Sequence, residues 1–301
     1  MQIVLAENFR AVFYAPFYAC LALGFFRDKG LEVVLRDSAS PGGGIADMMT
    51  GSTDLVWGGP LRVLKDRDQR PAGPHSLVAF GEVAARDPFF LVGRPSLAGF
   101  RLQDLPALSF GSVSEVDTPW LCLQQDLRRH GIDPNIIQRQ HDAAMPENLR
   151  RLARGQIDVI QVFEPYVTLA EQSGVGIPLH AAHTRGLTAY TTFLSTAQKL
   201  ELHASAFQTM ARAIESFNPW LASEGVAELA RLIARFYPDV DRWVLERSLI
   251  RYDNAKLWSC RTHVSREGFD RLAQSMLSGR FINTITPYES CVAPWAQAQS
   301  L

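Results

Sequence analysis

The chain begins with short apolar runs separated by amphipathic segments. The runs are rich in β-branched residues, which is typical of strands buried in a parallel sheet, and they cover residues 3–7, 31–37 and 53–59. The segments between them have the apolar spacing of helices and cover residues 16–30 and 44–51. Gly30 and Gly51 close these segments, and glycine supplies the left-handed residue that ends a helix. The pattern predicts a β-α-β-α-β unit.

The same order of elements returns about a hundred residues later. The second set of predicted strands covers residues 107–112, 135–140 and 157–165, and the predicted helices cover residues 119–131 and 145–155. Gly155 closes its helix as Gly51 does in the first unit, and an aspartate follows each glycine three residues later, at Asp54 and Asp158. Such a repeat predicts two similar α/β lobes.

Two further apolar stretches and a helical C-terminal half complete the pattern. The stretches at residues 77–95 and 189–200 predict strands, and helical spacing recurs at approximately 204–224, 225–236, 240–249 and 265–279. Because this half contains no third β-α-β unit, we expect it to pack on the first lobe.

The predicted fold is therefore of the α/β class, with two lobes. Lobe I comprises residues 1–90 and 190–301, and lobe II comprises residues 91–189. Two crossings between the lobes, near residues 86–95 and 185–195, would form a hinge beside a cleft.

Loops that follow the strands are the candidate ligand-binding segments, because ligands of open parallel sheets bind beyond the carboxyl ends of the strands. Gly42-Gly43-Gly44 lies between a strand and a helix, where free helix N–H groups can bind an anion. The run matches neither GxGxxG nor the P-loop pattern, and Lys65 is too far along the chain to act as a P-loop lysine. We therefore expect the rim of a ligand cleft, or a plain turn, and no nucleotide cofactor.

Polar residues gather before the helix that Pro119 opens. Ser112, Ser114 and Thr118 have the hydroxyl groups that cap helices, and the same groups can hold a polar ligand. Glu164 ends a strand before Pro165, so its carboxylate could accept hydrogen bonds from a ligand or act as a base. Arg10 and Asp87 are the charged alternatives.

Aromatic residues are dense in the predicted cleft loops: Phe9, Phe13, Tyr14, Phe17, Trp57, Phe89, Trp120, Tyr166 and Tyr190. We expect Phe17 and Trp57 in the core, whereas Phe9, Tyr14, Trp120 and Tyr166 suit either the pocket or the core. Since aromatic faces stack on planar molecules, the set favours a ring-containing ligand over a bare inorganic anion.

Composition excludes several classes of protein. Lysine and arginine number 30 against 31 acids, so the chain lacks the excess of basic charge that nucleic-acid binders need. The sequence contains no run of 18 apolar residues, so it predicts no membrane helix, and the opening "MQIVLAENFR" lacks the pattern of a leader peptide. The four cysteines and seven histidines have no metal-site spacing, although Cys260 and Cys291 could pair in an oxidising compartment.

Four stretches resemble substrate-binding proteins of ABC importers, and more narrowly the NMT1/THI5-like group, which includes nitrate, sulfonate, taurine and pyrimidine-precursor binders. They are "FYAPFYACLALGFFRDKGLEVVL", "MMTGSTDLVWGG", "LARGQIDVIQVFEPY" and "GFDRLAQSMLSGRFINTITPYESCV". The resemblance implies a type II periplasmic-binding-protein fold whose lobes close on one small molecule and then dock on a membrane permease. We expect a monomer, since a hinged receptor needs its lobes free.

The resemblance and the strand ends together select the expected ligand-binding positions. These are Asn8, Phe9, Arg10, Tyr14, Ser38, Ser40, Gly42, Gly58, Gly59, Asp87, Ser112, Ser114, Thr118, Trp120, Glu164, Tyr166 and Tyr190.

An enzyme branch of the same family, the pyrimidine synthases of thiamine biosynthesis, carries a lysine and a histidine after the first lobe's G-x-x-D strand. This chain reads "VWGGPLRVL" there, with Gly59 and Val63 at those positions. We therefore expect a solute-binding protein and no catalysis, located in the periplasm or at the cell surface if a leader has been removed. The alternatives, if Met1 is the native start, are a cytoplasmic enzyme on the same fold that acts on a small aromatic substrate, or a ligand sensor.

Overall fold

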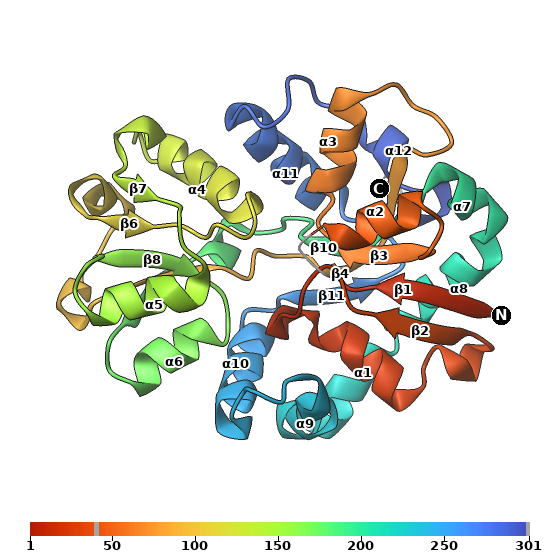
Figure 1. Cartoon of the computed structure of the whole chain (residues 1–301), viewed down its shortest axis with the longest axis horizontal. Coiled ribbons are helices and arrows are strands. Elements are labelled where there is room, and N and C mark those ends of the chain that lie inside the picture. The colour runs from red at the N-terminus through yellow and green to blue at the C-terminus, as the bar shows by residue number, and fades with distance from the viewer. Residues whose placement is uncertain (39–41, 299–301) are drawn as a thin grey trace.

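Two mixed β-sheets organise the chain, and they stand beside each other in Figure 1. The computed structural model describes residues 1–38 and 42–298. The strands are β1 (Gln2–Ala6), β2 (Glu32–Arg36), β3 (Leu55–Gly58), β4 (Leu77–Ala84), β5 (Phe90–Gly93), β6 (Phe110–Gly111), β7 (Arg139–Gln140), β8 (Val159–Val162), β9 (Ile177–Ala181), β10 (Thr191–Thr196) and β11 (Trp258–Arg261).

Helices flank both sheets. They are α1 (Ala15–Leu23), α2 (Gly43–Met49), α3 (Leu61–Gln69), α4 (Thr118–Arg129), α5 (Met145–Ala153), α6 (Tyr166–Gln172), α7 (Ala197–Leu202), α8 (Ala204–Ile214), α9 (Phe217–Ile233), α10 (Arg242–Asn254), α11 (Arg266–Ser278) and α12 (Tyr288–Cys291). Short 3-10 turns connect several of them.

The first sheet has the strand order β11-β4-β10-β3-β1-β2, and the second has the order β7-β6-β8-β5-β9. In each sheet three strands of the predicted unit run parallel. In the first sheet β10 pairs antiparallel with β3, and in the second sheet β5 pairs antiparallel with β8. The chain leaves the first sheet after β4 and returns to it at β10, so two adjacent crossings join the lobes. The carboxyl ends of β1, β3 and β6 all open toward the space between the lobes.

The predicted helix over residues 16–30 is wrong in its length. Pro16 lies in the first turn of α1, where its missing N–H costs nothing, and Gly24 ends the helix with a φ of 77°. Residues Arg27–Lys29 form a separate 3-10 turn that ends at Gly30. The predicted strand over residues 135–140 is also too long, because Asp133 caps a 3-10 turn and only Arg139–Gln140 pair with the sheet.

The core of lobe I is aromatic. Phe17 stacks on Trp57 with ring centroids 4.3 Å apart, and both side chains are fully buried, as expected from the sequence. All four cysteines are buried and free, so Cys260 and Cys291 do not pair. No helix in the described part of the chain is long and apolar enough to cross a membrane.

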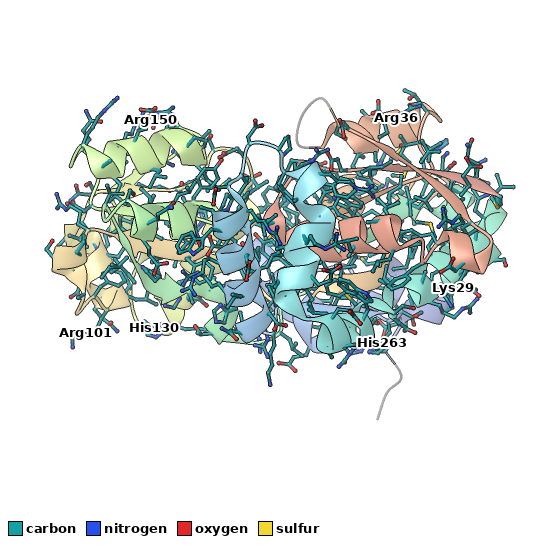
Figure 2. The ribbon with its side chains drawn as sticks, turned by 90° about the horizontal axis from the view of Figure 1, so that it is seen from below. Lys29, Arg36, Arg101, His130, Arg150 and His263 are labelled. Atoms are coloured by element: carbon teal, nitrogen blue, oxygen red, sulfur yellow. The ribbon has the colours of Figure 1, made fainter. Side chains whose placement is uncertain are left out.

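Charged residues are spread over both lobes. Figure 2 shows Arg101, His130 and Arg150 at the periphery of lobe II, and Lys29 and His263 at the periphery of lobe I. This dispersal matches the balanced charge of the sequence.

Candidate ligand-binding site

A cavity of about 400 Å³, here named the cleft cavity, lies where the two lobes face each other. Its walls come from the loop after β1, from α3, from the two crossings and from the loop that leads into α4. Its volume is within the range of small-molecule sites. The loops that follow the strands, from which a cleft was predicted, therefore do line a cavity.

Arg62 is a charged residue of the cleft cavity that forms no ion pair among the described residues. Its Nη2 donates to Asn8 Oδ1 at 3.0 Å, and no carboxylate among the described residues lies within ion-pair distance of its guanidinium. Burial removes water from this cation and lowers the pKa of Arg62 below its ordinary value. The side chain therefore offers unused N–H donors and a positive charge to whatever enters the cavity, although the Asp117 carboxylate in the same cavity wall offsets part of that charge.

The surroundings of Arg62 hold it in place. Asn8 Oδ1 also accepts the N–H of Gly42 at 2.8 Å, so one amide oxygen joins the loop after β1, the triglycine and α3. A methyl group added at Gly42 would lie 2.8 Å from Arg62 Nη1. The triglycine thus forms the rim beside the guanidinium, where a side chain would displace it.

Aromatic rings form much of the remaining wall: Phe9, Phe13, Tyr14, Phe89 and Tyr190. Phe13 lies 4.3 Å from Tyr14 and 6.1 Å from Tyr190, measured between ring centroids. The Tyr190 hydroxyl is buried and has no hydrogen-bond partner in the described part of the chain. Burial raises the pKa of Tyr190 well above its usual value, so the group stays protonated and can donate to a ligand.

Six of the residues selected from the sequence line the cleft cavity: Asn8, Phe9, Tyr14, Gly59, Thr118 and Tyr190. Gly42 and Gly58 do not line it, but both border the Arg62 side chain. The Ser38 hydroxyl is buried and unpartnered among described atoms, and Ser40 lies outside the described residues.

Four other selected residues on lobe II do not reach this cavity. Ser112 is buried and accepts a hydrogen bond from Arg139 Nε at 2.7 Å, and Ser114 is exposed. Trp120 packs beneath the Arg139 guanidinium, 4.7 Å from it. Tyr166 lines a neighbouring cavity instead.

The charged residues selected from the sequence are already paired. Arg10 binds Glu7 and Asp37, at 2.7 Å and 2.9 Å. The buried Glu164 carboxylate accepts from Arg251 Nε at 2.5 Å and from Thr168 N at 3.0 Å. It therefore joins lobe II to α10 and does not line the cleft cavity, because its hydrogen-bonding capacity is used in that contact.

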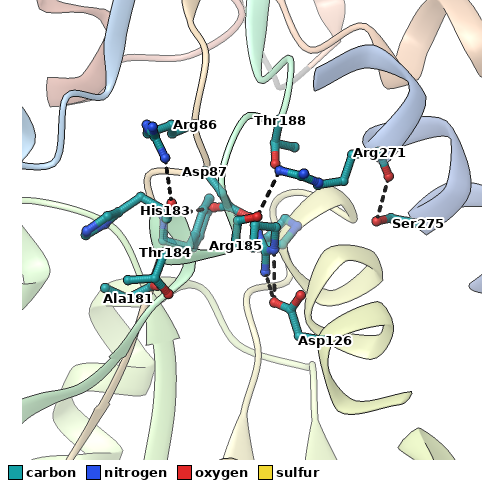
Figure 3. A network of polar contacts seen from close by, with 12 residues as sticks. Arg86, Asp87, Asp126, Ala181, His183, Thr184, Arg185, Thr188, Arg271 and Ser275 are labelled. Atoms are coloured by element: carbon teal, nitrogen blue, oxygen red, sulfur yellow. Dashed lines mark hydrogen bonds and ion pairs between the residues drawn. The ribbon is translucent and has the colours of Figure 1, made fainter. Parts of the chain in front are cut away.

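Asp87 lies on the first crossing between the lobes. The buried Arg185, on the second crossing, pairs with Asp87 on the first crossing and with Asp126 on α4 (Figure 3). Arg271 on α11 donates to the carbonyl oxygens of Arg185 and Leu187, at 2.8 Å and 2.6 Å. One network thus connects both crossings to a helix of each lobe. Burial raises the pKa of Asp87, and the Arg185 charge opposes this effect.

Sequence reasoning missed Arg62. Helix N-termini repel cations, because the helix dipole is positive there, yet Arg62 occupies the first turn of α3. An arginine in that position, directly after the glycine-rich end of β3, was the available signal.

A model of the NMT1-like family matches residues 96–234 of the chain. The protein of Bacillus subtilis (strain 168) named "Putative binding protein YtlA" is 24% identical over 263 residues, which are 86% of this chain and 77% of that one. The resemblance to the NMT1/THI5-like binding proteins is thereby confirmed.

Two solved structures show the same architecture. The periplasmic aliphatic sulphonate binding protein SsuA of Escherichia coli has a TM-score of 0.80 at 13% identity, with 98% of this chain and 97% of that chain covered. The alkanesulfonate-binding protein SsuA of Xanthomonas axonopodis pv. citri, bound to MOPS, has a TM-score of 0.74 at 15% identity, with 97% and 98% covered. These likenesses confirm the predicted two-lobe fold of periplasmic binding proteins.

Proposed function

We propose that this protein is a solute-binding protein that captures a small organic anion between its lobes and delivers it to an ABC-type importer. The observation that carries the proposal is Arg62, a half-buried guanidinium that forms no ion pair among the described residues and lines the interlobe cavity. Periplasmic or cell-surface location, a permease partner and a monomeric state are parts of the same proposal.

An acidic group is the partner that suits Arg62. A carboxylate or sulfonate can accept two parallel N–H bonds from a guanidinium, and such charge-assisted bonds are among the strongest in proteins. Asn8 holds one Nη group at 3.0 Å and so orients the remaining donors before the ligand arrives. Tyr190 lines the same cavity, and its unpartnered hydroxyl is the candidate for a further donor.

The rest of the ligand faces aromatic rings. Phe9, Phe13 and Tyr14 come from lobe I, Phe89 and Tyr190 from the two crossings, and Val116 from lobe II. A ligand in this cavity contacts both lobes at once. The closed arrangement is then favoured by the additional contacts that the ligand makes in it. The two similar SsuA structures, which are of sulfonate-binding proteins, support the choice of an organic anion.

Calorimetric titration with alkane- and arylsulfonates, carboxylates, pyrimidines and nitrate tests the proposal. We expect an organic anion to bind, and we expect Arg62→Gln to weaken that binding about a hundredfold or more, because losing one partner of a buried charge pair costs about 2–5 kcal/mol. Arg62→Lys should retain part of the affinity, since lysine keeps the positive charge but lacks the two parallel N–H groups of the guanidinium.

The matched control is Arg150→Gln, which removes an exposed arginine at the periphery of lobe II (Figure 2) and should leave the affinity unchanged. Equal binding of the anion to wild type and Arg62→Gln would contradict the proposal. Recovery of a chemically altered ligand by mass spectrometry would instead indicate an enzyme.

A further inference from the structure

A second interlobe cavity, of about 390 Å³, adjoins the cleft cavity, and we name it the distal cavity. Lobe I contributes residues 9–12 and 236–240 to its wall, and lobe II contributes Met145, Phe163 and Tyr166 among others. Phe9, Glu115 and Val116 line both cavities. The two spaces are therefore neighbours, separated by these three residues.

The distal cavity differs from the cleft cavity in its chemistry. Most of its wall is aromatic or aliphatic: Val12, Met145, Phe163, Tyr166, Phe236, Tyr237, Pro238 and Val240. Its charged members are engaged or exposed. Arg10 pairs with Glu7 and Asp37, and the Glu115 carboxylate accepts the N–H groups of Met145 and Ser114, at 2.9 Å and 3.1 Å. Asp239 is exposed.

Aromatic rings lead from one cavity to the other. Phe9 lies 5.5 Å from Tyr14, in the wall of the cleft cavity, and 6.1 Å from Phe163, in the wall of the distal cavity. Phe163 in turn lies 6.2 Å from Tyr166. Phe9 is only partly buried and stacks nearly parallel to Phe163, so its ring forms an apolar part of the wall that the two cavities share.

We infer that the distal cavity is a subsite for the apolar end of the ligand. The ligand class is an elongated amphipathic anion, whose acidic group binds Arg62 and whose alkyl or aryl body extends past Phe9 to Met145 and Tyr166. This inference rests on the proposed function. It adds that the distal cavity selects anions by the length of their alkyl or aryl part.

A homologous series of linear alkanesulfonates, from ethane- to octanesulfonate, measures the subsite directly. For the wild type we expect the affinity to rise about fourfold for each methylene group that becomes buried. Met145→Trp fills the distal cavity from lobe II, so it should abolish this rise for the longer members and leave the affinity for ethanesulfonate unchanged.

Tyr166→Ala is the second variant, because Tyr166 is half-buried and lines the distal cavity but not the cleft cavity. It should lower the affinity for the long sulfonates at least tenfold, with little effect on the short ones, even if Met145→Trp does not fold.

The two proposals fail in different ways. If short and long sulfonates bind equally tightly to the wild type, and Arg62→Gln still weakens both, the distal subsite is wrong and the proposed function stands. If long sulfonates gain affinity that neither Met145→Trp nor Tyr166→Ala reduces, the subsite is also wrong. If no anion of any length binds, the proposed function itself is wrong.

Discussion

Arg62 occupies a position that disfavours it unless an anion is bound. The first turn of α3 presents unpaired N–H groups and the positive end of the helix dipole, which opposes a cation by about 0.3–1 kcal/mol. Burial adds to this cost, as the lowered pKa of Arg62 indicates. Under the proposed function an incoming acidic group would remove both penalties together, and the unliganded protein would already hold the site arranged for it.

Glu82 is a second ionisable group held in an unfavourable place. It is buried in lobe I, pairs with no base among the described residues, and accepts a hydrogen bond from Ser265 N at 3.3 Å. Burial raises the pKa of Glu82 to about 7 from 4.5. The folded protein therefore keeps a proton that the unfolded chain releases between pH 4.5 and 7, and the free energy of unfolding falls as the pH rises through this window.

Glu82→Gln should remove that fall, because the amide stays neutral at every pH. Above pH 7 the variant should be more stable than the wild type by about 3 kcal/mol, and below pH 4.5 the two should be alike. Urea unfolding at pH 4.5, 6 and 8 measures the difference, with the exposed Glu201→Gln as control. A constant difference across this range would show that folding does not raise the pKa of Glu82.

At the scale of elements, period and glycine placement predicted where the parallel strands of both lobes lie, although the strand predicted at residues 135–140 is only Arg139–Gln140. Runs such as residues 3–7 and 157–165 form strands that are buried on both faces, so most of their residues are apolar and the strands can be recognised from the sequence. Strand β9 was not predicted, because an edge strand that contains Pro178 carries little apolar signal. Helix α3 was also missed, since charged residues fill most of its turns.

Cleft residues next to strand ends could be predicted in the same way, whereas paired charges could not. Asn8 and Tyr14 follow β1 directly, and they do line the cleft cavity. Glu164 also follows a strand, but its partner Arg251 lies 87 residues further along the chain. No local sequence pattern predicts such a contact, because it depends on where α10 packs.

A β-bulge shapes strand β4, and Gly81 is its extra residue. Glu82 and Phe80 pair with the consecutive residues Thr192 and Phe193 of β10, so Gly81 has no partner there. Its φ of +59° is the left-handed conformation, and a methyl group at this position would lie 3.0 Å from the Phe193 ring.

Gly81→Ala should therefore lower the free energy of unfolding by about 2 kcal/mol, from left-handed strain and crowding together. Chemical denaturation measures the loss. Gly99→Ala is the control, because an added methyl group meets nothing within 4 Å there and the change should stay within about 0.5 kcal/mol. Equal stability of the two variants would mean that β4 accommodates a side chain at the bulge.

At the scale of the whole molecule, Arg185 holds the two crossings together. Arg185→Gln leaves the buried carboxylates of Asp87 and Asp126 without their shared cation, and such a loss costs about 3–5 kcal/mol. We expect urea unfolding to show a decrease of that size. Arg231→Gln, which breaks an exposed pair with Glu228, should cost less than about 1 kcal/mol. A loss as small as the control's would indicate that the hinge does not depend on this network.

The two crossings also set the order in which the lobes can fold during synthesis. Lobe II is one uninterrupted insert, from β5 to β9, and all its strands are made before β10. Strand β4, in contrast, waits for both of its neighbours, β10 and β11, which come from residues 191–196 and 258–261. A nascent chain can therefore complete lobe II while strand β4 still has no partner and β3 still lacks its β10 neighbour, so lobe I is the part of the chain open to wrong strand pairing until residues 258–261 have been made.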